Sequence, residues 1–237
     1  MTAARRRARS DSSLALVACL TLSSALVLVL AGCEERRATA VRFVELTTPP
    51  LRGALVVDGS SRSIARVALL EALDARSGAP TLVGAGPWRT VAVVRGAEVP
   101  ADAARSGRTY VRWGRGAVRV EVKLAAATRG AFTGGVVETS ATRALVQIRV
   151  EDPERPTDRF RLEIVGDDGR RRRPPGDVTP RYLAHAVPRG TYRAFVDVPD
   201  AGGRYLVHVV STTERGDRTS DAWTSPIAVE RPWLARD

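Results

Sequence analysis

Alternation of apolar and polar residues is the feature that most constrains how this 237-residue chain can fold. The clearest example is AVRVEVKL (117–124), in which three valines alternate with Arg119, Glu121 and Lys123. Successive side chains of a β-strand point to opposite faces of a sheet, so a period of two predicts a strand with one buried face. We therefore expect most of the chain beyond residue 40 to form β-sheet.

Strand-like runs recur along the chain, separated by Gly, Pro and Asp residues that favour turns. In the first half they are 41–46, 53–59, 88–96, 108–113 and 117–124. In the second half they are 136–140, 144–152, 159–167, 181–187, 191–198, 204–212 and 225–230. Residues 63–75 differ, because apolar residues recur there every three positions. That spacing favours a short helix, with a buried strand as the alternative.

These runs predict an all-β protein with two β-sandwich-like domains. Turn signals recur about every 8–15 residues in the second half, which is typical of a sandwich. The stretch 125–134 contains several small residues and is the expected boundary. We place a β-rich domain of unknown family at 41–128, the sandwich at 129–230 and a tail at 231–237.

The N-terminus has a different organisation. Arginines at positions 5, 6, 7 and 9 precede an apolar run from Leu14 to Leu30, and the sequence then continues as Ala31-Gly32-Cys33. A positive start, an apolar middle and small residues before a cleavage point are the layout of a secretory signal. The four residues from Leu30 to Cys33 resemble the lipobox of bacterial lipoproteins, and they match it at all four positions.

The resemblance to a lipoprotein implies a specific chemistry at Cys33. Residues 1–32 would be the signal peptide that is removed, and the Cys33 thiol would carry a diacylglyceryl group. Residues 33–40 would then be a short acylated tether. The positions that signal peptidase would recognise are Leu30, Ala31 and Gly32.

Lipidation would place the protein in the cell envelope, anchored to a membrane by the acyl chains on Cys33. Glu34 follows the cysteine, and this residue favours the outer membrane, with the plasma membrane as the alternative. An uncleaved transmembrane helix is the competing interpretation, because the apolar run is about long enough to span a bilayer. The other cysteine, Cys19, lies inside the signal, so the mature chain would contain no disulfide.

Residues 199–230 resemble the closing strands of a fibronectin type III module. They contain a Pro/Gly corner, then Tyr205, alternating valines, a loop and a last strand led by Ser225-Pro226. The resemblance implies an immunoglobulin-like sandwich in which Tyr205 is the corner tyrosine, with its hydroxyl bonded back to the backbone. The tryptophan that the family usually carries on its second strand is missing from 144–152, which leaves other immunoglobulin-like sandwiches open.

Signals of catalysis are nearly absent. The chain has two histidines, His185 and His208, which are far apart, and it has no asparagine. His208 falls on the strand face opposite Tyr205 and Val207, where we expect it at the surface. No nucleophile elbow is present, and the cysteines and histidines do not have the spacing of a zinc site. We expect a protein that is not an enzyme and that uses no metal and no cofactor.

The net charge of +11 comes from 37 basic and 26 acidic residues, and every basic residue except Lys123 is an arginine. This composition is typical of a GC-rich genome, so the charge is weak support for nucleic acid, and no nucleic acid is expected as a partner.

Two loops stand out as candidate sites. Arg170, Arg171, Arg172 and Arg173 follow a hairpin turn and form a candidate anion-binding loop, with a solvated loop as the alternative. Residues 215–217 form the tripeptide Arg-Gly-Asp, which is also ordinary turn chemistry.

The sequence therefore predicts a lipid-anchored envelope lipoprotein that acts as a structural or binding module. One alternative is a protein that binds carbohydrate or an anionic polymer, such as lipopolysaccharide or an acidic glycan. Another is an accessory subunit of an envelope enzyme or secretion complex. The expected partners are the membrane and either an envelope protein or an anionic polysaccharide.

Overall fold

The computed structural model describes residues 40–47, 54–57, 81–114, 116–166 and 180–233. The signal peptide, nearly all of the tether, the helix expected at 63–75 and the end of the tail lie outside these residues. In the part that is described, no helix has the length and apolar content that crossing a membrane requires.

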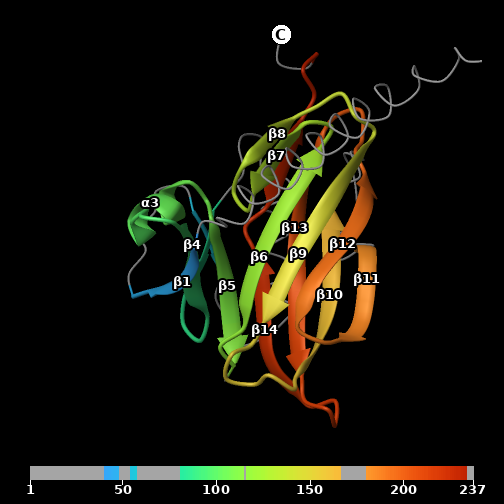
Figure 1. Cartoon of the computed structure of the whole chain (residues 1–237). Coiled ribbons are helices and arrows are strands. Elements are labelled where there is room, and N and C mark those ends of the chain that lie inside the picture. Colours follow the sequence, from blue (N-terminus) through green and yellow to red (C-terminus); the bar gives the residue numbers. More distant parts are fainter. Residues whose placement is uncertain (1–39, 48–53, 58–80, 115, 167–179, 234–237) are drawn as a thin grey trace, which may run out of the picture. The chain divides into compact units, whose positions relative to one another are not determined.

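Two β-sheets contain most of the described strands (Figure 1). The main path of the nine-stranded sheet, the large sheet, is β1 (Val41–Leu46), β4 (Arg89–Arg95), β5 (Thr109–Gly114), β14 (Arg218–Thr224), β13 (Gly203–Thr212), β10 (Arg159–Gly166) and β11 (Pro180–Val187). Beside this path, β15 (Ile227–Glu230) pairs with β13 and, in parallel, with β8 (Val136–Glu138). The four-stranded sheet has the order β12 (Gly190–Asp197), β9 (Arg143–Glu151), β6 (Arg119–Ala126) and β7 (Arg129–Phe132). The all-β prediction is confirmed.

The core lies between these two sheets. On β6 the buried side chains are Val120, Val122, Leu124 and Ala126, which alternate with the more exposed residues that the sequence pattern assigned to the other face. They belong to one apolar cluster with Val207 and Val209 of β13. Burying a side chain of this size contributes roughly 1.5–3 kcal/mol, so the alternating strands account for much of the packing between the sheets.

Strands from both expected halves share the two sheets. In the large sheet β5 pairs with β14, and in the four-stranded sheet β6 pairs with β9. The expected boundary between residues 128 and 129 lies in the β6–β7 hairpin, where Ala126 pairs with Arg129. The described residues from Val41 onward belong to one compact unit, so the division into 41–128 and 129–230 is not a division of the described structure. The physical reason is that a strand edge leaves unpaired backbone groups, and each half satisfies them with strands of the other.

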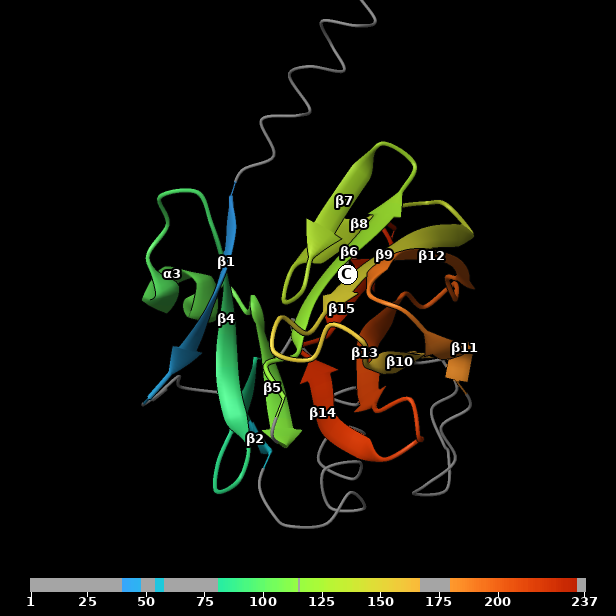
Figure 2. The ribbon, with the colours of Figure 1, turned by 60° about the horizontal axis from the view of Figure 1, so that its bottom comes forward.

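The first strands of the large sheet lie to one side of β6 and β7, with α3 (Pro100–Arg105) beside them (Figure 2). Pro100 starts this helix, where its missing N–H costs no hydrogen bond. Ala103 packs with Ala92 and Val94 on one face of β4. The sequence analysis did not predict this helix, which has only six residues and too little length for a periodic pattern.

A short parallel pair, β2 (Leu55–Val57) and β3 (Leu82–Gly84), contributes a second apolar cluster. Val57 and Leu82 pack there with Leu206 and Trp223 of the large sheet. Since Leu206 alternates with the core residues of β13, this cluster covers part of the large sheet on the face that points away from the four-stranded sheet.

Arg231 is part of the fold, although the sequence analysis placed it in the tail. Its side chain is 1% exposed. The guanidinium donates hydrogen bonds to four backbone carbonyls, which belong to Pro199 (3.0 Å), Thr139 (3.2 Å), Ala141 (2.7 Å) and Val198 (2.7 Å). A planar group with five N–H donors can satisfy several carbonyls at once, so Arg231 joins three segments at one end of the sandwich.

Candidate functional site

The structure describes only one of the site residues that the sequence predicted. Cys33, Leu30, Ala31, Gly32 and the loop from Arg170 to Arg173 lie outside the described residues. Tyr205 is buried at the start of β13, and its hydroxyl donates a 2.6 Å hydrogen bond to the carbonyl of Asp197. This is the kind of bond that a corner tyrosine makes to the backbone upstream of it.

Each sheet has an outer face, which we define as the face turned away from the other sheet. The outer face of the large sheet carries a row of cross-strand neighbours, Glu163, His208 and Trp223, on β10, β13 and β14. His208 Nδ1 lies 3.2 Å from Glu163 Oε2, and Nε2 lies 2.6 Å from Asp221 Oδ1. The imidazole also stacks on the indole of Trp223, with 3.8 Å between ring centroids.

Two arginines complete what we call the His208 network, which comprises Arg161, Glu163, His208, Arg218 and Asp221. Arg161 pairs with Glu163 at 3.3 Å, and Arg218 pairs with Asp221. His208 was expected at the surface, but its side chain is only 12% exposed. Its burial lowers the pKa of His208, and the hydrogen bond to Glu163 acts in the opposite direction.

Satisfied hydrogen bonds make the His208 network a structural feature. Both nitrogens of the ring face a carboxylate oxygen, and both carboxylates also accept from an arginine. Buried polar groups that are paired in this way fix the relative positions of the strands that carry them. In the described part of the chain, no group of three or more His, Cys, Asp or Glu residues is arranged to hold a metal ion.

The outer face of the four-stranded sheet is different, because it carries charged side chains in the open. Most of its cations are paired with carboxylates of the same face. Arg119 and Arg149 both lie near Glu151, at 3.4 and 3.8 Å. Arg143 lies 3.7 Å from Asp197. These arginines therefore offer little uncompensated charge to a ligand.

Lys123 and Arg193 are the exceptions on this face. Both are exposed, and neither has a carboxylate partner among the described residues. The strand register aligns Arg193 of β12 with Gln147 of β9, and Gln147 with Lys123 of β6. We call these three residues the cationic row. Neighbouring strands lie about 4.8 Å apart, so the two cations stand roughly 10 Å apart with an amide between them.

A second row lies beside the cationic row on the same face. It consists of Phe195, Leu145, Ala125 and Gly130, which are aligned across all four strands and which we call the apolar row. Phe195 is 61% exposed, the largest value among the big apolar side chains of the described chain. The Arg143 guanidinium lies 5.0 Å from the centroid of its ring. Exposed aromatic and cationic side chains in register are more typical of a binding surface than of a solvated face.

Phe132 and Arg95 lie at the β7 end of the cationic row. Phe132 pairs with Lys123, and the Arg95 guanidinium lies over its ring at 3.4 Å from the centroid. Arg95 also pairs with Glu121 of β6, so its charge is compensated. Arg95 thus links β4 of the large sheet to this outer face and covers the Phe132 ring.

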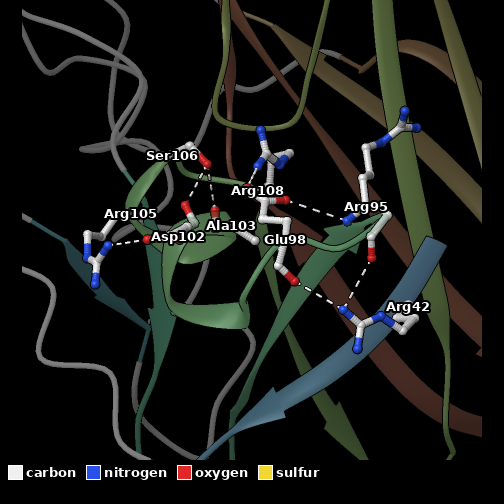
Figure 3. Close-up of polar contacts among 9 residues, drawn as sticks. Arg42, Arg95, Glu98, Asp102, Ala103, Arg105, Ser106 and Arg108 are labelled. Atoms are coloured by element: carbon white, nitrogen blue, oxygen red, sulfur yellow. Dashed lines mark hydrogen bonds and ion pairs between the residues drawn. The ribbon is translucent and has the colours of Figure 1, made fainter. Parts of the chain in front are cut away.

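Polar contacts around α3 hold the loop after Arg95 in place (Figure 3). The Arg95 N–H faces the Glu98 carboxylate at 3.5 Å, and Arg108 pairs with the same carboxylate. Arg42 donates to the carbonyls of Gly96 (3.4 Å) and Glu98 (3.0 Å). The arginines of this region are used within the fold, so the basic composition of the first half does not produce an open cationic surface here.

The Arg-Gly-Asp tripeptide forms the turn between β13 and β14 and is exposed. Gly216 has φ of +87°, a conformation that side chains disfavour. The Thr213 N–H donates to the Asp217 carbonyl at 2.8 Å, and the Gly216 N–H donates to the Thr213 carbonyl at 2.9 Å. The geometry of a tight hairpin turn is sufficient to explain this sequence.

Sequence reasoning placed Lys123 on an exposed face but missed the cationic row. A local pattern shows which residues of one strand point outward, whereas the row depends on which residues of three strands lie side by side. The sequence offers one weak signal of a special role for Lys123, because it is the only lysine in a chain whose other basic residues are all arginines.

Comparisons with known proteins give no family. No protein-family model matches the sequence, and no curated protein matches it significantly. The chain is similar in structure to the soluble domain of PmoD from Methylocystis sp. ATCC 49242 (Rockwell), with a TM-score of 0.34 and 16% identity, over 49% of this chain and 94% of that one. It is also similar to a Niemann-Pick type C2 protein from the Japanese carpenter ant, with a TM-score of 0.25 and 8% identity, over 49% and 98% of the two chains. Likenesses at this level carry no argument about function.

Proposed function

We propose that this protein is a non-enzymatic binding module of the cell envelope, and that it recognises an anionic partner through the cationic row. The observation that carries the proposal is the state of the charges on one sheet face. Glu121, Glu151 and Asp197 are each matched by an arginine, while Lys123 and Arg193 have no carboxylate partner in the described part of the chain. An anionic group placed between them would gain two charge-assisted contacts.

The free cations add little to the stability of the fold itself. Exposed ion pairs contribute about 0–1 kcal/mol, and these two side chains form no ion pair with any residue that the structure describes. Their side chains are therefore available to a ligand at no cost to the packing. Gln147 lies between them and can donate or accept a further hydrogen bond.

The resemblance of residues 30–33 to a lipobox supports the location. A module held at a membrane by acyl chains on Cys33 meets the polymers of the envelope at high local concentration. Outer membranes carry anionic lipopolysaccharide on one face, which agrees with the charge of the cationic row. An accessory role beside an envelope enzyme needs the same anchor but does not explain the two free cations.

The double variant Lys123→Gln/Arg193→Gln tests the binding proposal. We expect the full-length protein, in a neutral detergent, to bind lipopolysaccharide and heparin in a salt-dependent manner, and the double variant to bind at least about tenfold more weakly, equivalent to ~1.4 kcal/mol. The matched control is Arg159→Gln/Arg215→Gln, which removes two exposed arginines from other positions. Equal loss in both variants would show a response to net charge and contradict a defined site.

The Cys33→Ala variant tests the anchor. We expect the protein to move from the membrane fraction to the soluble fraction, and labelling with palmitate to disappear, because the thiol that carries the acyl chains is gone. Continued association with membranes in high salt would instead support an uncleaved transmembrane helix.

A further inference from the structure

We infer that the anionic partner is an acidic polysaccharide, which lies across the strands with its sugar rings on the apolar row and its acidic groups against the cationic row. This inference rests on the proposed function and adds the chemical class of the ligand. It follows from the way the two rows run side by side, with one residue of each row on each of three strands.

The two rows repeat the same arrangement of side chains on three successive strands. Each strand places one apolar residue and one hydrogen-bonding residue two positions apart on the outer face. The pairs are Phe195 with Arg193 on β12, Leu145 with Gln147 on β9, and Ala125 with Lys123 on β6. The repeat distance between strands is about 4.8 Å, and the rows are separated by about 6.7 Å along each strand. A chain of rings with polar substituents along one edge matches this arrangement.

The apolar row is accessible to a flat ligand. Phe195 is 61% exposed even though the Arg143 guanidinium lies over its ring, 5.0 Å from the centroid. The side chains become smaller toward β7, from Phe195 through Leu145 to Ala125 and Gly130. The negative π face of an aromatic ring attracts the partly positive C–H groups of a sugar, and the small residues allow the ligand to approach the backbone.

The cationic row suits carboxylate or phosphate groups that are spaced along a polymer. Arg193 can bind such a group through two N–H donors, and Lys123 offers three donors on a flexible stem. Gln147 between them suits a hydroxyl group, because its amide both donates and accepts. A nucleic acid would present a charge at every step of its backbone, and two free cations neutralise too few of them for stable binding.

Three polymers separate this inference from the proposed function. Polygalacturonate has sugar rings that carry carboxylates, long-chain polyphosphate has charge without rings, and dextran has rings without charge. We expect the full-length protein in neutral detergent to bind polygalacturonate best. Phe195→Ala should weaken binding of polygalacturonate about tenfold, which is the effect of losing one well-placed aromatic contact, and leave binding of polyphosphate within about twofold.

Trp233→Ala is the matched control, because Trp233 is an exposed aromatic residue (50%) outside the four-stranded sheet. It should change no affinity, and the unfolding midpoint of each variant shows whether the fold is intact. Failure of wild-type protein to bind polygalacturonate more tightly than dextran overturns the inference, as does an unchanged affinity in Phe195→Ala.

The pattern of losses separates the two proposals. Loss of polyphosphate binding in Lys123→Gln/Arg193→Gln, with no effect of Phe195→Ala on any polymer, supports the proposed function and overturns the polysaccharide. Equal binding of every polyanion by wild type and by Lys123→Gln/Arg193→Gln overturns both. The vesicle assay uses the Cys33→Ala protein without detergent, so that neither detergent nor acyl chains decide the result. If Phe195→Ala weakens binding to phosphatidylglycerol vesicles as much as binding to polygalacturonate, a membrane is the partner and the polysaccharide is overturned.

Discussion

The two outer faces of the sandwich carry similar residue types and use them in opposite ways. On the large sheet, arginines, carboxylates and an aromatic ring surround His208, and the imidazole and both carboxylates are largely buried and paired. On the four-stranded sheet, Lys123 and Arg193 are exposed and have no carboxylate partner among the described residues, and Phe195 beside them is exposed as well. The difference shows that composition does not identify a binding face. What matters is whether the charges are already paired within the fold.

Much of this difference depends on whether another element packs over the face. The β2–β3 pair packs with Leu206 and Trp223 on the large sheet, and this removes neighbouring polar groups from water. A charge that is removed from water must be paired, because an isolated buried ion is very costly. Among the described residues no strand or helix packs over the cationic row, so Lys123 and Arg193 are under no such requirement.

Asp221 and Asp197 give the largest expected contrast between the faces. Asp221 is buried and accepts from His208 and Arg218, so Asp221→Ala removes a buried carboxylate that both of them contact and should reduce the free energy of unfolding by about 3–5 kcal/mol. Asp197 has a side chain that is 85% exposed, and Asp197→Ala should cost no more than about 0.5 kcal/mol. Urea denaturation of both variants measures the difference, and similar losses would show that the two faces do not differ in this way.

Sequence reasoning predicted the strands whose alternation is regular, and it failed where buried residues are polar. β6 was predicted because Val120 and Val122 alternate with charged residues. β14 was missed because its sequence, RTSDAWT, reads as a polar loop. Asp221 is tolerated inside that strand only because Arg218 and His208 lie beside it, and His208 comes from a different strand. Such compensation is invisible in a local pattern.

The candidate site could be predicted only in part for a related reason. The outward direction of Lys123 follows from its position in an alternating strand. Its place in a row with Arg193 depends on the register of β6 with β9 and of β9 with β12. The same tertiary information decides which arginines are consumed by ion pairs, so a count of basic residues could not separate the free cations from the paired ones.

The pH dependence of stability should be specific to the large sheet. Because burial lowers the pKa of His208, the folded state binds a proton less readily than the unfolded chain, whose histidine titrates near 6.5. The contribution of neutral His208 to the free energy of unfolding is therefore fully present above about pH 6.5. It is lost as the pH falls below that value toward the lower pKa of the folded state. The groups that face the ring are Glu163 and Arg161 from β10, and Asp221 and Arg218 from β14.

His208→Gln provides the comparison for this effect. The free energy of unfolding, measured by urea denaturation between pH 5.5 and 8, should depend less on pH in the variant than in the wild type. An identical slope in both proteins, or greater stability of the wild type below pH 6.5, would show that the carboxylates around His208 outweigh its burial.

The smallest effect is expected on the exposed face. Lys123→Gln/Arg193→Gln should change the free energy of unfolding by less than about 0.5 kcal/mol, because both side chains are exposed and the contact of Lys123 with the Phe132 ring is a long one, at 5.8 Å. Thermal unfolding in the absence of polyanions measures this, and the same preparation can then be used for binding. A loss above about 1 kcal/mol would mean that the row contributes to the fold and not only to recognition.

The pairing of β5 with β14 delays folding until the chain is nearly complete. Val111 lies opposite Trp223, so a strand made early in synthesis waits for one made close to the C-terminus. Long-range pairing of this kind slows folding, because the loop between the strands must close before the contacts form. In a chain threaded through a membrane pore with its N-terminus first, the large sheet would therefore be completed only after residue 224 has emerged, whereas all strands of the four-stranded sheet would already be outside.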